Sequence, residues 1–414
     1  MMKSASRTRN GSVGKVKITS LAVAHLFHDI YTSFLAPVLP LLIDKLALSY
    51  AAAGFLSVLM RLSSLASPLV GSWADRWRLK YIVIVSPAVT AAAMCLIGSA
   101  PDYRTLSMLI VLAGVSSTCF HVPAPVLITQ VAGRRPGAAM SLFQVGGELS
   151  RTIGPLVVLG AVSIWSLEGM YRLFPLGVLT SLLLHWALRE VPGSAPAPAR
   201  PTGNGRTREM LRAEWRFFTA LFGILVCKSC VASVVAAFLT VYLTAQGTGL
   251  WLAGGALSLL QGAALAGVCI TGWLSDRIGC TAILIGLTLA SPLLMLLFVF
   301  SGGWLLPAAL VLLGLGAFSS TPVVLSLIQQ RCRAYPATAN GIYMMMSFTM
   351  GAVTVMLAGM LSDVLGISSA LKVCAACSFL GLPFLVLMPQ KKLHTGPSRG
   401  EDENSVGTAG RWEP

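Results

Sequence analysis

An aspartate and two histidines interrupt an apolar stretch near the start of the chain. The stretch ITSLAVAHLFHDIYTSFLAPVLPLLI, residues 18–43, contains His25, His28 and Asp29. His25 and Asp29 are four residues apart, so on a helix they share a face, and His28 lies less squarely on it. Charged side chains inside a membrane are costly and usually face a cavity or a partner. An aspartate balanced between burial and neighbouring cations can exchange protons near neutral pH, which is the chemistry of a proton carrier.

Further polar residues lie on helices predicted later in the first half of the chain. His121, within the predicted helix 105–130, is a further histidine that can approach Asp29, or it can serve only as a hydrogen-bonding residue between helices. Glu148 and Arg151 are one helical turn apart and can form a structural or gating pair. We predict four residues that carry or gate protons: Asp29, His25, His121 and Glu148.

Fixed positive charges outnumber acids inside the predicted helices. A guanidinium group binds a carboxylate or phosphonate through two parallel hydrogen bonds, so this surplus predicts a cavity that accepts an organic anion. The predicted substrate-binding residues are cationic or amide side chains: Arg61, Gln144, Arg151, Lys228 and Gln261. Two alternatives stay open. Asp29 can be a static ion-pair partner of Arg61, and Lys228 can extend its ammonium group to the membrane surface.

The composition places the chain among membrane proteins. Of its 414 residues, 55% are hydrophobic and 11% are charged, with a mean hydropathy of +0.78, whereas soluble proteins carry about 25% charged residues. Apolar stretches of about 20 residues, the length that crosses a bilayer core, recur throughout the chain. We predict an all-α integral membrane protein with 12 transmembrane helices: 18–43, 50–74, 81–100, 105–130, 138–163, 171–189, 215–245, 250–275, 281–300, 304–329, 338–361 and 367–389.

Basic residues are divided unequally between the two sides of this topology. Of the 30 Lys and Arg residues, 23 fall on the side that holds both termini, four on the opposite side and three inside helices. The excess predicts a multi-pass protein of the inner (plasma) membrane with both termini in the cytoplasm. The net charge of +15 therefore reports topology and does not indicate nucleic-acid binding. The basic residues of the N-terminal arm can contact anionic lipid.

The predicted organisation has five parts. They are a cytoplasmic basic arm (1–17), an N-terminal six-helix bundle (18–189), a cytoplasmic linker (190–214), a C-terminal six-helix bundle (215–389) and a disordered cytoplasmic tail (390–414). The linker is rich in proline, glycine, alanine and arginine, which is typical of a flexible connection. The two bundles are expected to be pseudo-symmetric and to surround a central cavity.

A sequence repeat supports two related halves. GSWADRWRLK at 71–80 resembles GWLSDRIG at 272–279, with an offset of 201 residues between Asp75 and Asp276. HVPAPVLITQ at 121–130 resembles STPVVLSLIQQ at 320–330, at nearly the same offset. Parallel repeats of this kind are an architecture of secondary transporters.

The repeated loop resembles the signature that follows the second helix in transporters of the major facilitator superfamily. The resemblance implies a gating loop that stabilises the outward-facing state, formed by six residues: Gly71, Asp75, Arg76, Arg78, Asp276 and Arg277. The signature carries a glycine after Asp-Arg-x; the first copy has Arg78 there, and the second copy keeps the glycine as Gly279 but lacks the basic run.

Three segments are similar to the fosmidomycin-resistance branch of that superfamily. They are FHVPAPVL, GAAMSLFQVGGELSRTIGPLV and the H-x-x-x-D formed by His25 and Asp29, although the branch has an asparagine where this chain has His28. Gly154 and Pro155 are similar to a remnant of the superfamily's antiporter motif and predict a helix kink. The branch implies proton-coupled drug efflux without naming a substrate.

Together these features predict a secondary active transporter that exports a small organic compound, anionic or drug-like, in exchange for protons. A proton-coupled importer or uniporter of a small organic anion on the same fold is the alternative. The chain has no GxxxxGK[ST] for ATP and no HExxH or GxSxG, so we expect no enzyme activity, no cofactor and no metal site. A membrane sensor would need a signalling domain that the linker and tail are too short to supply. The expected partners are the substrate, protons and membrane lipid, without nucleic acid, and a monomer suffices for transport.

Overall fold

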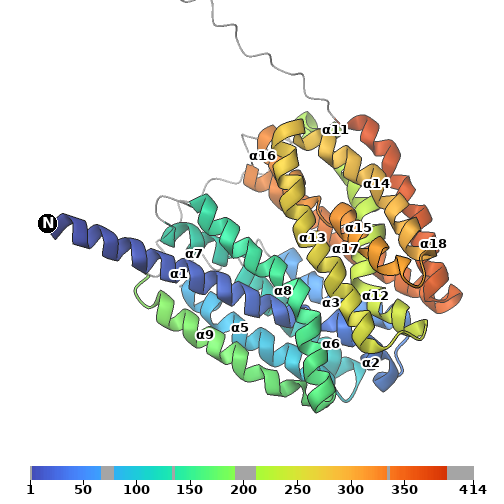
Figure 1. Ribbon diagram of the computed structural model, residues 1–414, viewed down its shortest axis with the longest axis horizontal. Coiled ribbons are helices and arrows are strands. Elements are labelled where there is room, and N and C mark those ends of the chain that lie inside the picture. The colour runs from blue at the N-terminus through green and yellow to red at the C-terminus, as the bar shows by residue number, and fades with distance from the viewer. Residues whose placement is uncertain (1, 67–78, 133–135, 192–210, 333–335, 389–414) are drawn as a thin grey trace, which may run out of the picture.

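The computed structural model describes residues 2–66, 79–132, 136–191, 211–332 and 336–388 (Figure 1). Within these ranges the chain is helical nearly throughout and contains no β-strand. Helices satisfy every backbone polar group within one segment, which is what the interior of a bilayer demands. Four predicted gating-loop residues (Gly71, Asp75, Arg76 and Arg78), most of the predicted linker and the predicted tail 390–414 lie outside the described ranges.

The helices follow one another along the chain with short connections. The first half contains α1 (Met2–Thr32), α2 (Leu35–Leu46), α3 (Tyr50–Leu62), α5 (Leu79–Leu96), α6 (Tyr103–His121), α7 (Ala124–Val131), α8 (Pro136–Trp165) and α9 (Phe174–Leu188). The second half contains α11 (Trp215–Lys228), the π-helix η4 (Ser229–Ser233), α12 (Val234–Ala245), α13 (Leu250–Ile278), α14 (Cys280–Phe300), α15 (Leu305–Ala317), α16 (Thr321–Arg331), α17 (Pro336–Leu365), α18 (Ile367–Ser378) and the 3₁₀-helix η5 (Phe379–Leu387).

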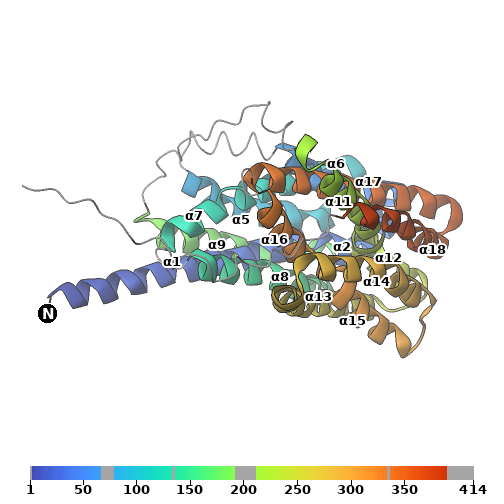
Figure 2. The same ribbon diagram turned by 90° about the horizontal axis from the view of Figure 1, so that it is seen from above.

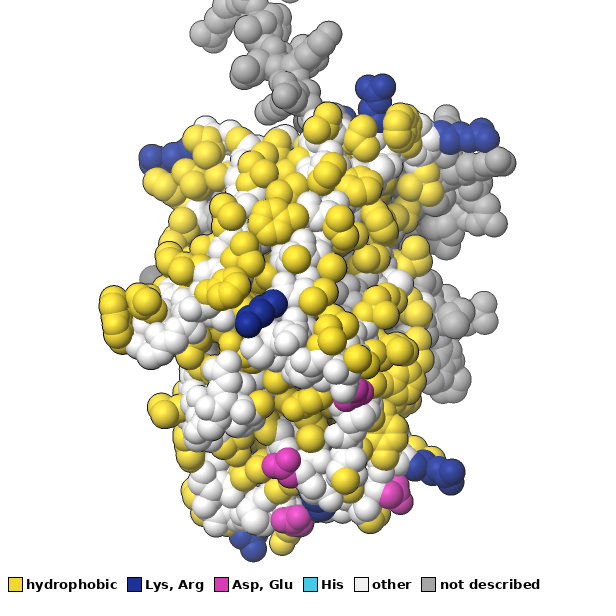
Figure 3. All heavy atoms as spheres, turned by 90° about the vertical axis from the view of Figure 1, so that its right-hand side faces the viewer, with side chains coloured by type: hydrophobic (Ala, Val, Ile, Leu, Met, Phe, Trp, Pro, Cys, Tyr) yellow, Lys and Arg dark blue, Asp and Glu magenta, His cyan; other side chains and the backbone are white. Residues whose placement is uncertain are grey.

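Eleven segments of the described chain are long and apolar enough to cross a membrane. The predicted helix 50–74 is represented by the shorter apolar segment Tyr50–Leu65, which ends beside residues that are not described. Figure 3 shows a molecular face covered mainly by hydrophobic side chains, with acidic side chains gathered toward its lower part. The prediction of an all-α membrane protein is therefore confirmed, and the total of twelve spans stays a prediction.

Four of the predicted spans are interrupted, whereas the sequence predicted each as continuous. α1 and α2 are separated at residues 32–35, α6 and α7 at 121–124, and α15 and α16 at 317–321, while a π-helix lies between α11 and α12. The interruptions at Ser33 and in Ser229–Ser233 are separated by about the repeat offset, as are those before α7 and α16. Proline near the start of α7 and of α16 prevents a regular helix from running through. Interrupted helices of this kind are frequent at functional sites.

Hydrogen bonds between the two halves of the chain gather at one end of the molecule. Figure 1 shows α2 and α12 at this end, far from the start of α1 and of α11. Figure 2 shows the start of α1 projecting away from the helices of the second half. The Thr240 hydroxyl donates to the Ala36 carbonyl, which joins α12 to α2, and Trp251 Nε1 donates to Ser163 Oγ at 2.6 Å.

Lys80 ties the start of α5 to the end of α9. Its Nζ donates to the carbonyl oxygens of Val191 at 2.9 Å, Arg189 at 3.4 Å and Leu188 at 3.5 Å. The side chain is buried, and a cation at a helix C-terminus satisfies carbonyl groups that lack intrahelical partners. This contact therefore fixes two neighbouring spans of the first half against each other.

Replacing Lys80 by methionine should lower the melting temperature of the detergent-solubilised protein. The change leaves buried carbonyl oxygens without a donor, at a cost of about 1–3 kcal/mol in the free energy of unfolding. Thermal unfolding followed by tryptophan fluorescence measures the effect, with the exposed Lys15→Met as the control variant. Equal melting temperatures for Lys80→Met and the wild type would contradict the role assigned to this lysine.

Candidate functional site

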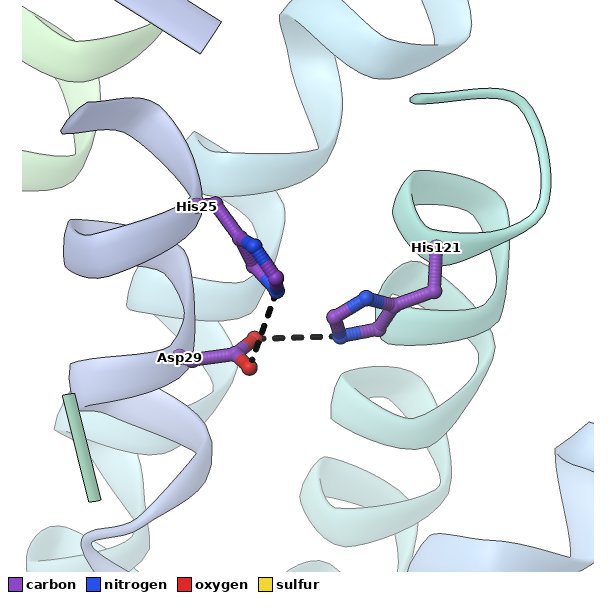
Figure 4. Close-up of side chains that lie close together, drawn as sticks. All are labelled: His25, Asp29 and His121. Carbon is purple, nitrogen blue, oxygen red and sulfur yellow. Dashed lines mark ion pairs between the residues drawn. The ribbon is translucent and has the colours of Figure 1, made fainter. Parts of the chain in front are cut away.

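Three histidine side chains contact the carboxylate group of Asp29 inside the first half of the chain. His25 Nε2 lies 3.3 Å from Asp29 Oδ2, and His28 Nδ1 and His121 Nε2 lie 2.9 Å and 3.0 Å from Asp29 Oδ1. Figure 4 shows His25 and His121 converging on the carboxylate from two different helices, α1 and α6. Asp29, His25 and His28 are buried, while the side chain of His121 is 39% exposed. Residues distant in sequence are thus assembled directly before the interruptions that follow α1 and α6.

The outer ring nitrogen of His25 is fixed as a hydrogen-bond donor. Its Nδ1 lies 2.7 Å from the carbonyl oxygen of Phe143. Because a carbonyl oxygen only accepts, this nitrogen carries a proton. A neutral imidazole has one N–H, so in neutral His25 the nitrogen that faces Asp29 has a lone pair and no proton.

A chain of hydroxyl groups fixes His28 in the same way. Ser116 Oγ donates to the carbonyl oxygen of Ser86 at 2.9 Å, and Thr90 Oγ1 donates to Ser116 Oγ at 2.8 Å. The Thr90 hydroxyl has then used its only proton, so it accepts from His28 Nε2 at 3.0 Å. In neutral His28 the nitrogen that faces Asp29 therefore also lacks a proton.

Two unprotonated ring nitrogens thus face one carboxylate unless additional protons are present. Each contact becomes a hydrogen bond only when a proton lies on the facing ring nitrogen or on the carboxyl group of Asp29. His121 differs, because no described residue accepts from its Nδ1, and its neutral ring can donate through Nε2. The number of protons in the cluster therefore decides whether the contacts to His25 and His28 attract or repel.

Aromatic rings and a glycine hold the histidines in place. Phe143 stacks on His25 with ring centroids 4.0 Å apart, and Phe120 stacks on His28 at 4.3 Å. A Cβ atom on Gly147 of α8 would lie only 2.5 Å from His25 Cε1. A glycine is therefore required where the His25 ring lies between α1 and α8.

His25, Asp29 and His121 are also the one group among the described residues whose ligand atoms lie within 4.8 Å of one another. Two imidazoles and a carboxylate are donors that transition metals accept. Both oxygens of Asp29 already contact ring nitrogens within hydrogen-bond or ion-pair distance. The donor atoms of this group therefore already contact one another within the cluster.

Arg61 lies where the two halves of the chain meet. A Cβ atom on Gly351 of α17 would be 2.9 Å from Arg61 Nη1 and 3.0 Å from Ser233 Oγ. Among the described residues, Arg61 has no acidic side chain within ion-pair distance, and Asp29 pairs with histidines instead. The structure therefore does not contain the Asp29–Arg61 ion pair that the sequence left open.

Glu148 pairs with Arg151 on α8 and not with the Asp29 cluster. Arg151 Nη1 lies 3.1 Å from both carboxylate oxygens of Glu148, and both side chains are partly exposed. Gln144, one turn earlier, is exposed as well. The geometry agrees with the predicted pair of Glu148 and Arg151, and the role of Glu148 in carrying or gating protons stays a prediction.

Lys228 and Gln261 lie on the second half of the chain. Lys228 precedes the π-helix, and its Nζ donates to Thr321 Oγ1 at 2.7 Å, at the interruption between α15 and α16. Its ammonium group is thus bound midway along two spans and does not extend to the membrane surface. Gln261 is half-buried, next to Gly262, where a Cβ atom would lie 3.3 Å from Thr152 Cγ2 of α8.

The structure describes the predicted kink at Gly154 and Pro155 and part of the second predicted gating loop. α8 runs unbroken through Gly154 and Pro155, and a Cβ atom on Gly154 would collide with Ser33 Oγ at the α1–α2 interruption. Arg277 stacks on the ring of Trp273 at 3.9 Å, and the side chain of Asp276 is not described. Gly279 has a φ of +92°, which explains why the second loop keeps a glycine there.

No role in the site was predicted from the sequence for Thr90, Ser116, Phe120 or Phe143. Their side chains are ordinary in an apolar helix, and only the hydroxyl groups of Thr90 and Ser116 offered a signal. Buried hydroxyl groups require partners, so small polar residues inside predicted helices were the available hint. His28, considered the less certain of the two histidines on α1, contacts Asp29 as closely as His121 does.

Comparison with known proteins decides the family. The model of the Major Facilitator Superfamily matches residues 21–355. The chain belongs to this superfamily. Superfamily members are transporters, so the chain is a membrane transporter and not an enzyme.

Several relatives match over most of this superfamily member. The Fosmidomycin resistance protein of Escherichia coli is 24% identical over 396 residues, which cover 94% of this chain and 95% of the relative. The Multidrug resistance protein MdtG of Serratia proteamaculans is 26% identical over 316 residues, covering 72% and 75%. The resemblance to the fosmidomycin-resistance branch is thereby confirmed.

Solved structures share the fold at low sequence identity. The nucleoside transporter NupG has a TM-score of 0.76 at 14% identity, covering 91% of this chain and 100% of that chain. A bacterial homologue of the human lysosomal transporter Spinster, in an inward-facing and occupied conformation, has a TM-score of 0.78 at 13% identity. The match covers 90% of this chain and 96% of the homologue.

Gly147→Ala should displace the His25 ring and uncouple it from Asp29. The added methyl group overlaps the ring, and overpacking of this kind costs about 1–3 kcal/mol. Gly160→Ala, also on α8, is the control, since a Cβ atom there would meet its nearest neighbour, Trp251, only at 4.0 Å. Melting temperature and transport in vesicles are measured for both variants. If Gly147→Ala behaves like Gly160→Ala in both measurements, the Gly147–His25 packing has no functional importance.

Proposed function

We propose that this transporter exports a small organic compound, anionic or drug-like, from the cytoplasm in exchange for protons. We further propose twelve spans arranged as two pseudo-symmetric six-helix bundles around a central cavity, in a protein that works as a monomer surrounded by lipid. Support for export comes from the relatives named for fosmidomycin and multidrug resistance. A proton-coupled importer or a uniporter of a small organic anion on the same fold is the alternative.

The observation that carries proton coupling is the pair of histidines whose unprotonated nitrogens face Asp29. With additional protons present, the contacts to His25 and His28 are hydrogen bonds that hold the cluster together. When protons leave, lone pairs on nitrogen face a negative carboxylate, and the contacts become repulsive. Loading and release of protons therefore favour different arrangements of the same side chains.

The interruption after α1 connects this change to the rest of the molecule. Asp29 lies four residues before Ser33, where α1 gives way to α2. α2 in turn contacts the second half, because Thr240 of α12 donates to the Ala36 carbonyl. A shift in the Asp29 cluster can thus reach the contact between the halves through a short stretch of chain.

The half-exposed His121 offers the cluster a path to water. It is the most exposed of the four side chains, and it ends α6 beside the α6–α7 interruption. The hydrogen bonds between the halves lie at the other end, and the excess of basic residues assigns the open end to the cytoplasm. We therefore infer an inward-facing state with both termini in the cytoplasm, from which protons leave through His121.

The positive charges near the junction of the halves favour an anionic substrate. Within the part of the chain that the structure describes, Arg61 has no acidic partner, and the hydroxyl group of Thr321 is the one hydrogen-bond partner of Lys228. Arg151 is neutralised by Glu148, so two cationic charges are left for a ligand. The amide side chains of Gln144 and Gln261 add neutral hydrogen-bonding groups. We also propose that the gating loops stabilise the outward-facing state, as the superfamily signature implies.

Asp29→Asn should abolish proton exchange, because an amide cannot accept and release the protons that the histidines share. Everted vesicles with a respiration-driven pH gradient and a pH-sensitive dye give the measurement, with fosmidomycin and other organic anions added. We expect at least a tenfold slower substrate-induced loss of the gradient, roughly 1.4 kcal/mol or more in the barrier. Asp44→Asn, at an exposed aspartate, is the matched control.

The same assay separates the alternatives. A wild-type response that persists in Asp29→Asn would show that this carboxylate does not carry the protons. A gradient collapse in right-side-out vesicles but not in everted ones would indicate import. No response to any compound, together with downhill movement of labelled substrate, would indicate uniport.

Arg61→Gln should weaken the binding of anionic substrates and spare neutral ones. Loss of a charge-assisted hydrogen bond costs about 1.5–3 kcal/mol, which corresponds to an increase in KM of about tenfold or more. Labelled uptake into everted vesicles gives KM for one anionic and one neutral compound, with the exposed Arg104→Gln as control. Equal losses for both compounds would show that Arg61 acts on the protein and not on the ligand charge.

A further inference from the structure

A carboxylate from the other half of the chain caps the N-terminus of α3. Asp363, near the end of α17, accepts from the backbone N–H of Tyr50 at 2.6 Å and of Ala51 at 2.9 Å. The first N–H groups of a helix have no intrahelical acceptor, and they form the positive end of the helix dipole. A carboxylate that accepts two of them makes a charge-assisted contact.

The cap that α3 carries in its own sequence leaves these two groups unsatisfied. Ser49 Oγ accepts only from the N–H of Ala52, at 3.1 Å. The N–H groups of Tyr50 and Ala51 are therefore satisfied by protein only while the halves are together at this end. When the halves separate, water must replace Asp363.

The sequence repeat produces a related contact on the other side of the molecule. Ser163 and Trp251 stand 200 residues from Asp363 and Ala51, respectively, which is the offset of the repeat. Trp251 Nε1 donates to Ser163 Oγ at 2.6 Å. The α8–α13 contact is thus the neutral equivalent of the ionised α17–α3 contact.

Close backbone packing surrounds the Asp363 contact. A Cβ atom on Gly359 would lie 2.5 Å from the Tyr50 carbonyl oxygen, and one on Gly54 would lie 3.0 Å from the Val355 carbonyl oxygen. Two glycines therefore allow α3 and α17 to approach along a seam that ends at Asp363. The contact lies at the tip of this seam and not at an isolated surface position.

We propose that Asp363 is a latch that holds the outer end of the transporter closed, and that Ser163 with Trp251 is its neutral counterpart. This inference rests on the proposed function only in that the two halves must part at this end during transport. In the closed state Asp363 bridges the halves through the α3 N-terminus. Removing its charge shifts the resting equilibrium toward the state that is open to the outside.

A cysteine placed in the seam reports this opening. Ala358 of α17 is buried, and it lies one turn after Val355 and next to Gly359, which both contact α3. Ala358→Cys in the full-length protein is labelled from the outside of intact cells with a membrane-impermeant maleimide. Protein without the added cysteine gives the background from the native thiols.

Asp363→Asn in the Ala358→Cys protein should raise the labelling rate about three- to fivefold. The magnitude reflects an exposed contact between a carboxylate and a helix N-terminus. Asp363→Ala, which removes both acceptor oxygens, should raise the rate further, and Ser163→Ala should raise it less. Asp44→Asn, a second exposed aspartate at the same end, should leave it unchanged.

An unchanged rate in Asp363→Asn, or the same increase in Asp44→Asn, would overturn the proposal. Size-exclusion profiles identify any variant that fails to fold, and Ser163→Ala then tests the other seam independently. Labelling needs neither a substrate nor a pH gradient. A failure of the export assay and a failure of the latch are therefore distinguishable.

Discussion

A carboxylate in the interior of a membrane must be compensated, and the compensation of Asp29 organises the first half of this transporter. Three imidazole rings meet its two oxygens, and each ring needs support of its own. His25 requires the Phe143 carbonyl and the space left by Gly147, while His28 requires the hydroxyl chain that begins at Thr90. The approach of α1 to α8 and α6 follows from holding one charge away from lipid.

Interruptions in the helices lie directly beside this charge. α1 and α6 end within four residues of Asp29 and His121, and the corresponding spans of the second half are interrupted beside Lys228 and Thr321. An uninterrupted helix would move as one rigid unit. Discontinuous helices of this kind form the binding sites of many secondary transporters.

Sequence reasoning recovered what periodicity and composition determine and missed what packing between helices determines. Helical spacing predicts that His25 and Asp29 share a face, and the apolar stretches predict the spans. The same spacing also predicts the pair of Glu148 and Arg151 within α8. It could not show that Thr90 reaches His28, because that contact depends on the rotation of neighbouring helices. The contact of Asp363 could not be predicted either, because its partners are backbone N–H groups, which every residue except proline has.

The two seams between the halves, α3–α17 and α8–α13, show how the repeated halves have diverged. One is joined by an ion and a helix terminus, and the other by an indole and a hydroxyl group. Parting the first breaks a charge-assisted contact with a helix N-terminus, while parting the second exchanges one neutral hydrogen bond for another. The two halves are therefore joined by one ionic edge, between α3 and α17, and one neutral edge, between α8 and α13.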